Sequence, residues 1–348
     1  MEDRKLCWGI IGCSNITERR AAPAIRDQPN SALHAFLSRS PARAREFAQT
    51  YGASCAYDDP DAFFADERID AVYIGTELYR HCEDTLRAAE HGKHVLCEKP
   101  MAMDPPECQR MIDACQANGV ALAIAYYRRY YPKALKMKAL IEAGAIGQPV
   151  MAHLAMGGPF DPSPDHPQAW RVVSAKGGGG ALQDVGSHKL DLFCLLLGSP
   201  VEASGFTQHL VHGYEAPDGE SAVVQFDSGA HAVLTCNWNL GVSADQFDIY
   251  GSRGALLASP FESDTLVLRS LAGQEEFHLP KDPNPHLPLF DDFTRRVLSG
   301  EPPAHPGEEG MKTTQVIAAV YESARAGRTV SIGPPASSEP TPGANAAR

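Results

Sequence analysis

The chain has 348 residues, of which 43% are hydrophobic and 21% are charged, and these proportions are typical of a globular protein. Its length exceeds what a single core usually supports, so we expect two domains. A formal net charge of -12 argues against nucleic acid as the main partner, because phosphate binding needs a basic surface.

The sequence shows neither a membrane-spanning pattern nor a disulfide framework. Its start, MEDRKLCWGIIG, is charged and passes directly into a strand-like run, and no apolar run approaches the roughly 18 residues that a membrane helix needs. The nine cysteines are scattered without a C-x-x-C pair, which fits reduced thiols. We therefore expect a cytoplasmic protein with no membrane partner.

Strand-like and helix-like segments alternate through the first part of the chain. Apolar runs predict strands at 6–12, 33–38, 70–76, 94–100 and 120–126. Helical spacing of apolar residues predicts helices at 41–52, 59–67, 79–92 and 104–119. Strands that are apolar on both faces and alternate with helices form a doubly wound parallel sheet. Residues 1–126 are therefore predicted to be an α/β domain of the Rossmann type.

The second part of the chain has a different pattern. After a predicted helix at 128–144, period-two alternation predicts strands at 150–156, 201–210, 221–227, 231–240 and 245–251, and a hairpin at 250–258 that turns at Ser252 to Gly254. Helices are predicted at 290–300 and 307–327. We expect residues 127–332 to form an α+β domain with a mostly antiparallel open sheet. The Pro- and Ser-rich residues 333–348 are predicted to be a disordered tail.

The turn after the first predicted strand carries an imperfect dinucleotide fingerprint. In GCSNIT, which starts at Gly12, Ser14 and Thr17 stand where the fingerprint has a glycine and a very small residue. Ser14 is small enough for backbone amides to approach a pyrophosphate, and the helix expected from about Asn15 would offer its dipole. We predict that Gly12, Ser14, Asn15 and Ile16 contact an NAD(P) cofactor, although an ordinary glycine turn would look similar.

The end of the second predicted strand indicates which dinucleotide is bound. An NAD enzyme usually places an acidic residue there to hold the ribose 2′-hydroxyl, whereas this chain has Ser38, Arg39 and Ser40, with Arg43 one turn later. Hydroxyl and guanidinium groups suit a 2′-phosphate, and no carboxylate stands in this run to repel it. We therefore expect NADP rather than NAD, bound by Ser38, Arg39 and Arg43. The alternative is that both arginines only solvate the surface.

The motif CEKP at 97–100 places a lysine at the carboxyl end of a strand, where ligands bind in open α/β sheets. Lys99 could stabilise an alkoxide or polarise a carbonyl, and it is a candidate for both catalysis and cofactor contact. Glu98, and Thr76 at the end of the preceding strand, are further candidates for contacting the cofactor. A lysine that simply extends into solvent is the alternative.

The segment GGGGALQDVGSHKLD at 177–191 joins four glycines to a helix-like pattern. On a helix, Asp184 and His188 would share one face, and a histidine can exchange a hydroxyl proton near neutral pH. A glycine run is costly unless something must pass close to the backbone. Two other interpretations are open: a metal pair, for which no third ligand is evident, and a helix in which Asp caps and His packs.

Five of these segments together resemble the Gfo/Idh/MocA family of oxidoreductases. They are WGIIGCSNI, HGKHVLCEKP, RRYYP, GGGGALQDVGSHKLD and IYGSRGAL, and they span nearly the whole chain. The resemblance implies a Rossmann domain, a sheet domain that often dimerises, and a site between them with Lys99, Asp184 and His188 in catalytic positions. The sequence departs from the family pattern at Ser14, which replaces a glycine, and at Glu77, where many relatives have proline.

Other residues are assigned to the site by position or by the resemblance. The pair Trp170 and Arg171 also occurs in the family and is expected at the site entrance, unless Trp170 is a buried anchor. Arg128, after the strand ending at 126, is expected to face the same crevice unless it packs between domains. Asp191 could support His188, or it could pair with Lys189 or Arg171. We predict cofactor contacts for Arg128, Trp170 and Arg171.

Together these observations predict an NADP(H)-dependent oxidoreductase without a metal. It would move a hydride between the nicotinamide and a secondary alcohol or ketone carbon of a sugar, cyclitol or related polyol. If the glycine loop covers the nicotinamide, the missing side chains would let the backbone pass next to the cofactor. We expect a homodimer or homotetramer, because an open sheet face exposes apolar surface. A non-catalytic nucleotide-binding regulator on the same fold is the alternative.

Overall fold

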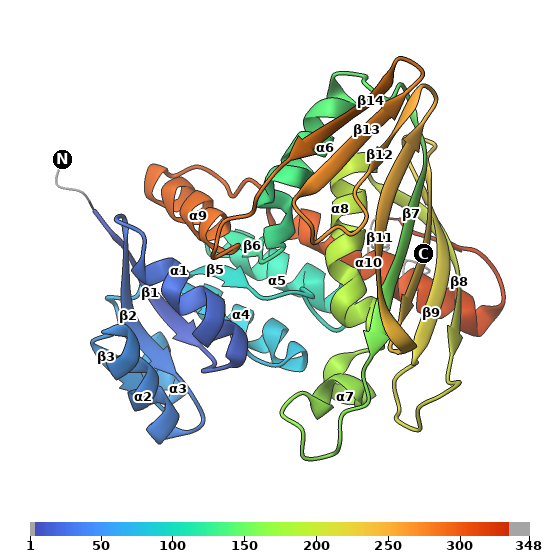
Figure 1. Ribbon diagram of the computed structural model, residues 1–348. Coiled ribbons are helices and arrows are strands. Elements are labelled where there is room, and N and C mark those ends of the chain that lie inside the picture. The colour runs from blue at the N-terminus through green and yellow to red at the C-terminus, as the bar shows by residue number, and fades with distance from the viewer. Residues whose placement is uncertain (1–3, 334–348) are drawn as a thin grey trace, which may run out of the picture.

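The amino-terminal half of the chain forms a six-stranded parallel sheet in the order β3-β2-β1-β4-β5-β6 (Figure 1). The computed structural model describes residues 4–333. The strands are β1 Leu6–Ile11, β2 Ser31–Leu37, β3 Cys55–Tyr57, β4 Ala71–Ile74, β5 His94–Cys97 and β6 Leu122–Ile124. The order reverses between β1 and β4, which is where such sheets bind ligands. The predicted Rossmann fold is confirmed, although the short, half-exposed β3 was not predicted.

Helices cover both faces of this sheet and begin where the sequence supplies capping groups. They are α1 Ala22–Arg26, which continues a π-helical turn at Thr17–Ala21, α2 Pro41–Tyr51, α3 Pro60–Phe64, α4 His81–Glu90 and α5 Pro105–Ala117. The side chains of Ser40, Asp59 and Asp104 accept hydrogen bonds from the first turns of α2, α3 and α5. Each of these three helices has proline in its first turn, as expected for a helix start.

The second half forms a nine-stranded, mostly antiparallel sheet in the order β14-β13-β12-β11-β7-β10-β9-β8-β15, in which only β7 and β10 pair in parallel. Its strands are β7 Pro149–Pro159, β8 Pro200–Gln208, β9 Gly219–Phe226, β10 His231–Asn237, β11 Asn239–Gly251, β12 Gly254–Leu257, β13 Thr265–Ser270, β14 Gly273–His278 and β15 Val330–Ser331. The predicted open sheet and its hairpin are confirmed. β13, β14 and β15 were not predicted.

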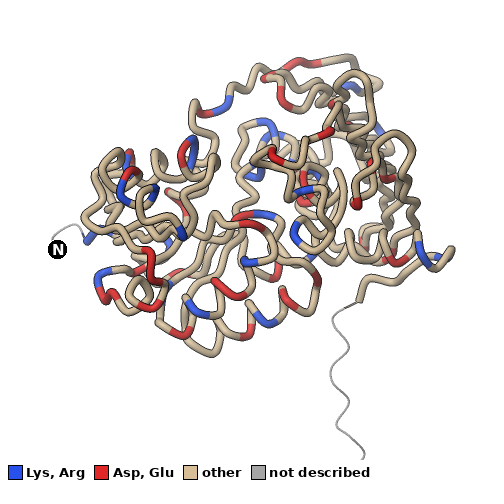
Figure 2. The backbone as a smooth tube through the Cα atoms, turned by 90° about the horizontal axis from the view of Figure 1, so that it is seen from below, with Lys and Arg blue, Asp and Glu red and all other residues tan. Residues whose placement is uncertain are grey.

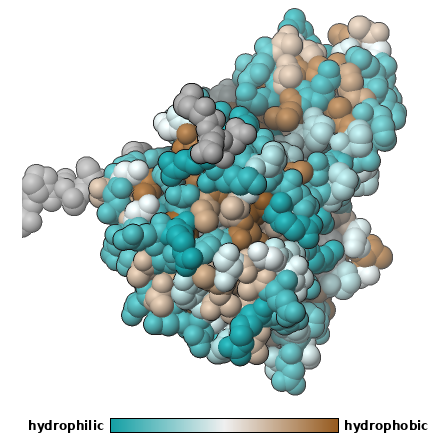
Figure 3. All heavy atoms as spheres, turned by 90° about the vertical axis from the view of Figure 1, so that its left-hand side faces the viewer, coloured by the Kyte–Doolittle hydropathy of each residue, from teal (hydrophilic) through white to brown (hydrophobic). Residues whose placement is uncertain are grey.

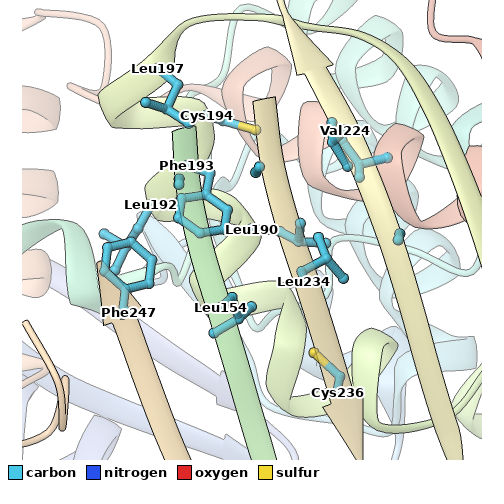
Figure 4. Close-up of a cluster of buried hydrophobic side chains, with 14 of the residues drawn as sticks. Leu154, Leu190, Leu192, Phe193, Cys194, Leu197, Val224, Leu234, Cys236 and Phe247 are labelled. Carbon is cyan, nitrogen blue, oxygen red and sulfur yellow. The ribbon is translucent and has the colours of Figure 1, made fainter. Parts of the chain in front are cut away.

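One face of this sheet is buried by helices. α6 Pro132–Glu142, the short α7 Ser174–Gly177, α8 Ser187–Leu197 and α10 Gly307–Ala326 belong to this half. Figure 4 shows Leu190 and Phe193 of α8 packed against Leu154, Leu234 and Phe247 of the strands. Alternate residues of β10 are buried, as the period-two pattern predicts. The core therefore lies between α8, α10 and one face of the sheet.

The helix α9 Leu287–Ser299 returns to the first sheet (Figure 1). Phe290 and Phe293 each lie 5.5 Å from Trp8 of β1, measured between ring centroids, and Phe290 lies 5.4 Å from Tyr73 of β4. A helix from the range predicted for the second domain thus completes the core of the Rossmann sheet. The boundaries at 126 and 332 otherwise remain predictions.

Two further features concern the chain as a whole. Within residues 4–333, none of the helices combines the length and the apolar character needed to span a bilayer. Lys and Arg alternate with Asp and Glu over the backbone in the view of Figure 2 and do not gather on one face. Apart from Gly333, the predicted tail lies outside the described residues.

Candidate active site

Lys99 and Asp184 meet at the carboxyl end of β5, where the two halves of the chain face each other. The Lys99 ammonium donates a hydrogen bond of 2.9 Å to the Asp184 carbonyl oxygen and lies 3.4 Å from its carboxylate. Both side chains are largely buried, at 14% and 13% exposure. Burial lowers the pKa of Lys99, and Asp184 opposes that shift. The structure therefore brings together two of the three predicted catalytic residues, which are 85 positions apart in sequence.

Asp184 is held from several directions. Arg171 donates to its carboxylate at 2.8 Å, and the Ser187 hydroxyl donates to its carbonyl oxygen at 3.0 Å. The Arg171 guanidinium also lies over the Trp170 ring, 5.6 Å from its centroid. Arg171 thus contacts Asp184 and Trp170 contacts Arg171, while the predicted cofactor contacts of both residues stay predictions.

His188 lies in the first turn of α8 and is buried. The Tyr127 ring meets the imidazole edge-on at 5.0 Å, and in the described part of the chain Nδ1 has no hydrogen-bond partner. Burial, followed by the charges of Arg128 and Lys99, lowers the pKa of His188 well below 6.5. His188 is therefore neutral at neutral pH, and the Asp184 carboxylate binds Lys99 and Arg171 in place of the imidazole.

Asp191 does not have the partners that the sequence suggested. It forms a buried ion pair with Arg129 at 2.7 Å, and both side chains are at most 2% exposed. Lys189 instead lies 3.2 Å from Asp245, and burial lowers its pKa to about 7. Asp191 does not pair with Lys189 or Arg171, because Arg129 binds it and so connects α8 to the turn after β6.

A histidine that the sequence analysis did not identify lies beside Tyr127 and Glu98. His286, the residue before α9, stacks on Tyr127 at 4.1 Å and lies 3.7 Å from the Glu98 carboxylate, which also accepts a 2.6 Å hydrogen bond from Tyr73. Burial favours a raised pKa for Glu98, but the interactions with His286 and Tyr73 outweigh it and leave that pKa lowered. Only the docking of α9 brings His286 here, and the local sequence gives no signal for it.

The turn after β1 is held tightly against the end of β4. Gly12 has a φ of +98°, and a Cβ there would lie 2.8 Å from the Gly75 carbonyl oxygen. The Ser14 hydroxyl donates to that oxygen at 2.9 Å, and the Thr17 hydroxyl donates to the Gly12 carbonyl at 2.7 Å. Helical structure begins at Asn15, so this residue and Ile16 present backbone amides at its start. Ser14 and Thr17 thus brace the turn that glycines form in the standard fingerprint.

At the end of β2, where a 2′-phosphate is predicted to bind, the side chains already have partners within the protein. Arg39 is 81% exposed and lies 3.9 Å from the carboxylate of Glu77, which follows β4. The Ser38 hydroxyl accepts from the Ser40 amide at 3.2 Å, and Arg43 donates to the Cys13 carbonyl at 2.7 Å. The run itself holds no carboxylate, as the sequence shows, but Glu77 reaches this end from the segment after β4.

Two other predicted cofactor contacts have side chains engaged elsewhere. The Thr76 hydroxyl donates to Asp84 of α4 at 3.0 Å, and Arg128 donates to Glu262 at 2.8 Å. Arg128 nevertheless lies close enough to His188 to lower its pKa. Arg128 and Glu262 therefore border the site from the side of the second sheet.

The glycine run is packed against protein atoms. A Cβ on Gly177 would overlap the Arg171 carbonyl, one on Gly179 the Tyr321 hydroxyl, and one on Gly180 the Glu220 carboxylate. The structure thus gives a packing reason for glycine at these positions, and the expectation that the loop passes next to a cofactor stays a prediction. Gly179 and Gly180 lack room for a side chain because helix α10 and strand β9 press against them.

A possible metal-binding cluster lies away from this site. His34, Cys55 and Asp66 place their ligand atoms within 4.8 Å of one another on the β2–β3 edge of the Rossmann sheet. The Arg68 guanidinium donates to Asp66 at 3.0 Å and lies 3.5 Å from the Cys55 sulfur. A permanent cation therefore already occupies this cluster, and the prediction of a metal-free active site stays a prediction.

The fold and this arrangement define a two-domain oxidoreductase on a dinucleotide-binding sheet. Comparison with known proteins identifies the family. Residues 6–126 match the model described as an oxidoreductase family with an NAD-binding Rossmann fold, and residues 134–257 match the GFO/IDH/MocA C-terminal domain. The chain belongs to the Gfo/Idh/MocA family, as the sequence resemblance predicted.

Individual relatives cover almost the whole chain. The 1,5-anhydro-D-fructose reductase of Ensifer adhaerens is 29% identical and covers 93% of this chain and 98% of its own. The myo-inositol 2-dehydrogenase of Thermotoga maritima is 28% identical with the same coverage. A crystal structure of the aldose-aldose oxidoreductase from Caulobacter crescentus, complexed with glycerol, is 28% identical, has a TM-score of 0.85, and covers 94% of this chain and 100% of its own.

The environment of His188 predicts the pH dependence of alcohol oxidation. A histidine accepts a proton only in its neutral form, and lowering its pKa keeps that form present as the solution becomes more acidic. We expect kcat/KM for oxidation to stay level from about pH 7.5 down to about pH 6, without the half-loss near pH 6.5 of an exposed histidine. An inflection near pH 6.5 that disappears in His188→Asn would contradict this assignment.

Proposed function

We propose that the protein is an NADP(H)-dependent oxidoreductase that interconverts a secondary alcohol and a ketone in a sugar, cyclitol or related polyol. The contact between Lys99 and Asp184 carries the proposal, because it places a buried cation and its partner at the carboxyl ends of the Rossmann strands. The relatives support the substrate class, since they are named for anhydrofructose, inositol and aldoses.

The residues of this chain divide the proton chemistry of the reaction. A nicotinamide held at the carboxyl ends of the Rossmann strands would supply the hydride chemistry at the carbinol carbon, in either direction. The substrate hydroxyl loses its proton to the neutral imidazole of His188 as the carbonyl bond forms. Lys99 stabilises the negative charge that develops on the same oxygen. Asp184, fixed by Arg171, keeps the Lys99 ammonium charged and oriented despite its burial.

Removing either reacting group should abolish turnover and spare nucleotide binding. We expect Lys99→Ala and His188→Ala each to lower kcat by about 10²-fold or more, while the Kd for NADPH changes little. The measurement pairs nucleotide titration with single-turnover hydride transfer against a panel of sugars and polyols. Lys138→Ala and His278→Ala, at an exposed lysine and an exposed histidine, serve as matched controls.

Two outcomes of this experiment would reject the proposed function. Wild-type turnover by His188→Ala would remove the acid–base role. Tight NADPH binding by the wild-type protein, with no turnover of any compound in the panel, would favour the nucleotide-binding regulator instead.

The proposal of NADP as the cofactor rests on Arg39, which is exposed and held only weakly by Glu77. Arg39→Asp should weaken NADPH binding by about tenfold or more and NADH binding much less, because a charge-assisted contact to the 2′-phosphate is replaced by repulsion. Glu77→Gln should do the reverse and strengthen NADPH binding a few-fold, because an exposed pair contributes little. Titration of both cofactors, with Arg45→Asp as control, tests this. A wild-type preference for NADH contradicts the proposal.

We propose that the open face of the second sheet joins two copies of the chain. Phe206 of β8, Val223 of β9, Met151 of β7 and Tyr250 of β11 are between 36% and 77% exposed on strands whose alternate residues are buried. The face on the Rossmann side, by contrast, is mainly hydrophilic with scattered apolar residues (Figure 3). Exposed apolar side chains on an open sheet face favour self-association.

Sedimentation analysis should accordingly give a species of at least twice the chain mass at micromolar concentration. Val223→Arg should shift it to the monomer, because a charge at the centre of a dry interface is left unpaired. A wild-type monomer at the same concentration would contradict the proposed interface.

A further inference from the structure

Tyr321 and Glu220, which have no part in the proposed proton transfer, both contact the glycine loop at 177–180. The Tyr321 hydroxyl of α10 accepts a 3.0 Å hydrogen bond from the Gly180 amide and donates one of 3.0 Å to the Glu220 carboxyl group of β9. Glu220 is 1% exposed. A side chain at Gly179 or Gly180 would overlap these two groups, so the loop fits against them without a gap.

Gly180 is also hydrogen-bonded directly to Asp184 of the proposed active site. The Gly180 carbonyl oxygen accepts a 3.2 Å hydrogen bond from the Asp184 amide, so both polar groups of one peptide residue are engaged. Asp184 in turn contacts Lys99 through its carbonyl and its carboxylate. A continuous series of hydrogen bonds therefore runs from Glu220 through Tyr321 and Gly180 to Asp184 and Lys99.

We propose that Glu220 and Tyr321 are positioning residues that hold Gly180, and through it Asp184, in the place where Asp184 meets Lys99. The inference rests on the proposed function, because it assigns the two residues a part in the same reaction. Neither residue touches the reacting atoms. Their effect is to restrict a loop whose glycines would otherwise give it more conformational freedom than any other sequence.

Glu220 and Tyr321 together form a clamp on Gly180. The hydrogen bonds of this clamp depend on the charge of Glu220. Burial raises its pKa to about 8, and the nearby Asp218 adds to the shift, while the Tyr321 hydroxyl and the amides of Leu182 and Gly180 oppose it. Cys236 of β10 also faces it, with a thiol whose pKa burial raises well above its usual value. Glu220 Oε2 has no hydrogen-bond partner among residues 4–333. Burial without a neighbouring cation therefore favours the protonated form at neutral pH.

The direction of the pH effect follows from this shift. A group whose pKa is higher in the folded than in the unfolded state stabilises the fold at low pH, and that stabilisation is lost as the pH rises through the folded value. Ionised Glu220 would be a buried negative charge beside Asp218 without a cation. We therefore expect the loop to loosen reversibly as the pH rises past about 8. Glu220→Gln, which keeps the shape and cannot ionise, should abolish that change.

Hydrogen exchange tests the clamp without requiring turnover. The peptide spanning 177–186 is followed in wild type, Glu220→Gln, Tyr321→Phe and the control Tyr51→Phe, which removes a tyrosine hydroxyl bonded to the Glu18 carbonyl in the Rossmann half, and protection factors are compared at pH 7 and pH 9. We expect wild type to lose about tenfold of its protection at pH 9 and Glu220→Gln to retain it. Tyr321→Phe should be less protected at both pH values, and Tyr51→Phe should match wild type. Equal protection in all four proteins would overturn the inference.

The pH profile of turnover separates positioning from a purely structural role. With any substrate that the panel identifies, wild-type kcat should fall above about pH 8, and Glu220→Gln should carry activity to higher pH with KM for NADPH unchanged. A profile that is identical in both proteins would overturn the inference. If no substrate is found, the proposed function fails, whereas the exchange experiment still decides whether the clamp exists.

Discussion

The contact between Lys99 and Asp184 is the interaction on which the rest of the structure depends. Lys99 stands at the end of a Rossmann strand, and Asp184 stands at the start of the helix that packs under the second sheet. Each is largely buried, and each has an opposite charge nearby, Lys99 through Asp184 and Asp184 through both Lys99 and Arg171. The pair therefore connects the two halves at the place of the proposed active site. Arg171 completes it by binding the second carboxylate oxygen.

Other buried polar groups hold the surroundings of this pair in register. Arg129 and Asp191 fix α8 to the end of β6, and the Glu98 carboxylate connects β5 to Tyr73 and to the start of α9. Such groups are costly to bury and gain little stability over apolar packing, but they permit few alternative arrangements. The glycine loop follows the same logic, because it can be pressed between β9 and α10 only where side chains are absent.

Local patterns were sufficient to predict most of the architecture. Apolar periodicity and capping residues located the Rossmann strands, their helices and the hairpin at Ser252, and the motifs around Lys99 and Asp184 identified the residues that meet. The misses share one physical origin, which is that contacts distant in sequence have no local signal. Glu77 approaches Arg39 from the segment after β4, and the packing of α9 on the first sheet places His286 beside Tyr127. Gly179 and Gly180 are in close contact with Tyr321 and Glu220. The shortest and most exposed strands, such as β3 and β14, lacked a pattern altogether.

A double-mutant cycle between Lys99 and Asp184 tests the central claim most directly. Lys99→Met and Asp184→Asn are measured singly and together in single-turnover hydride transfer, with nucleotide affinity followed in parallel. If the two residues act as one unit, the double variant will be about as slow as Lys99→Met alone, because Lys99→Met already removes the ammonium that contacts both the carbonyl and the carboxylate of Asp184, whereas Asp184→Asn removes only the carboxylate charge. If the two losses multiply, the residues act independently. The contact would then be a packing feature and not the basis of the site.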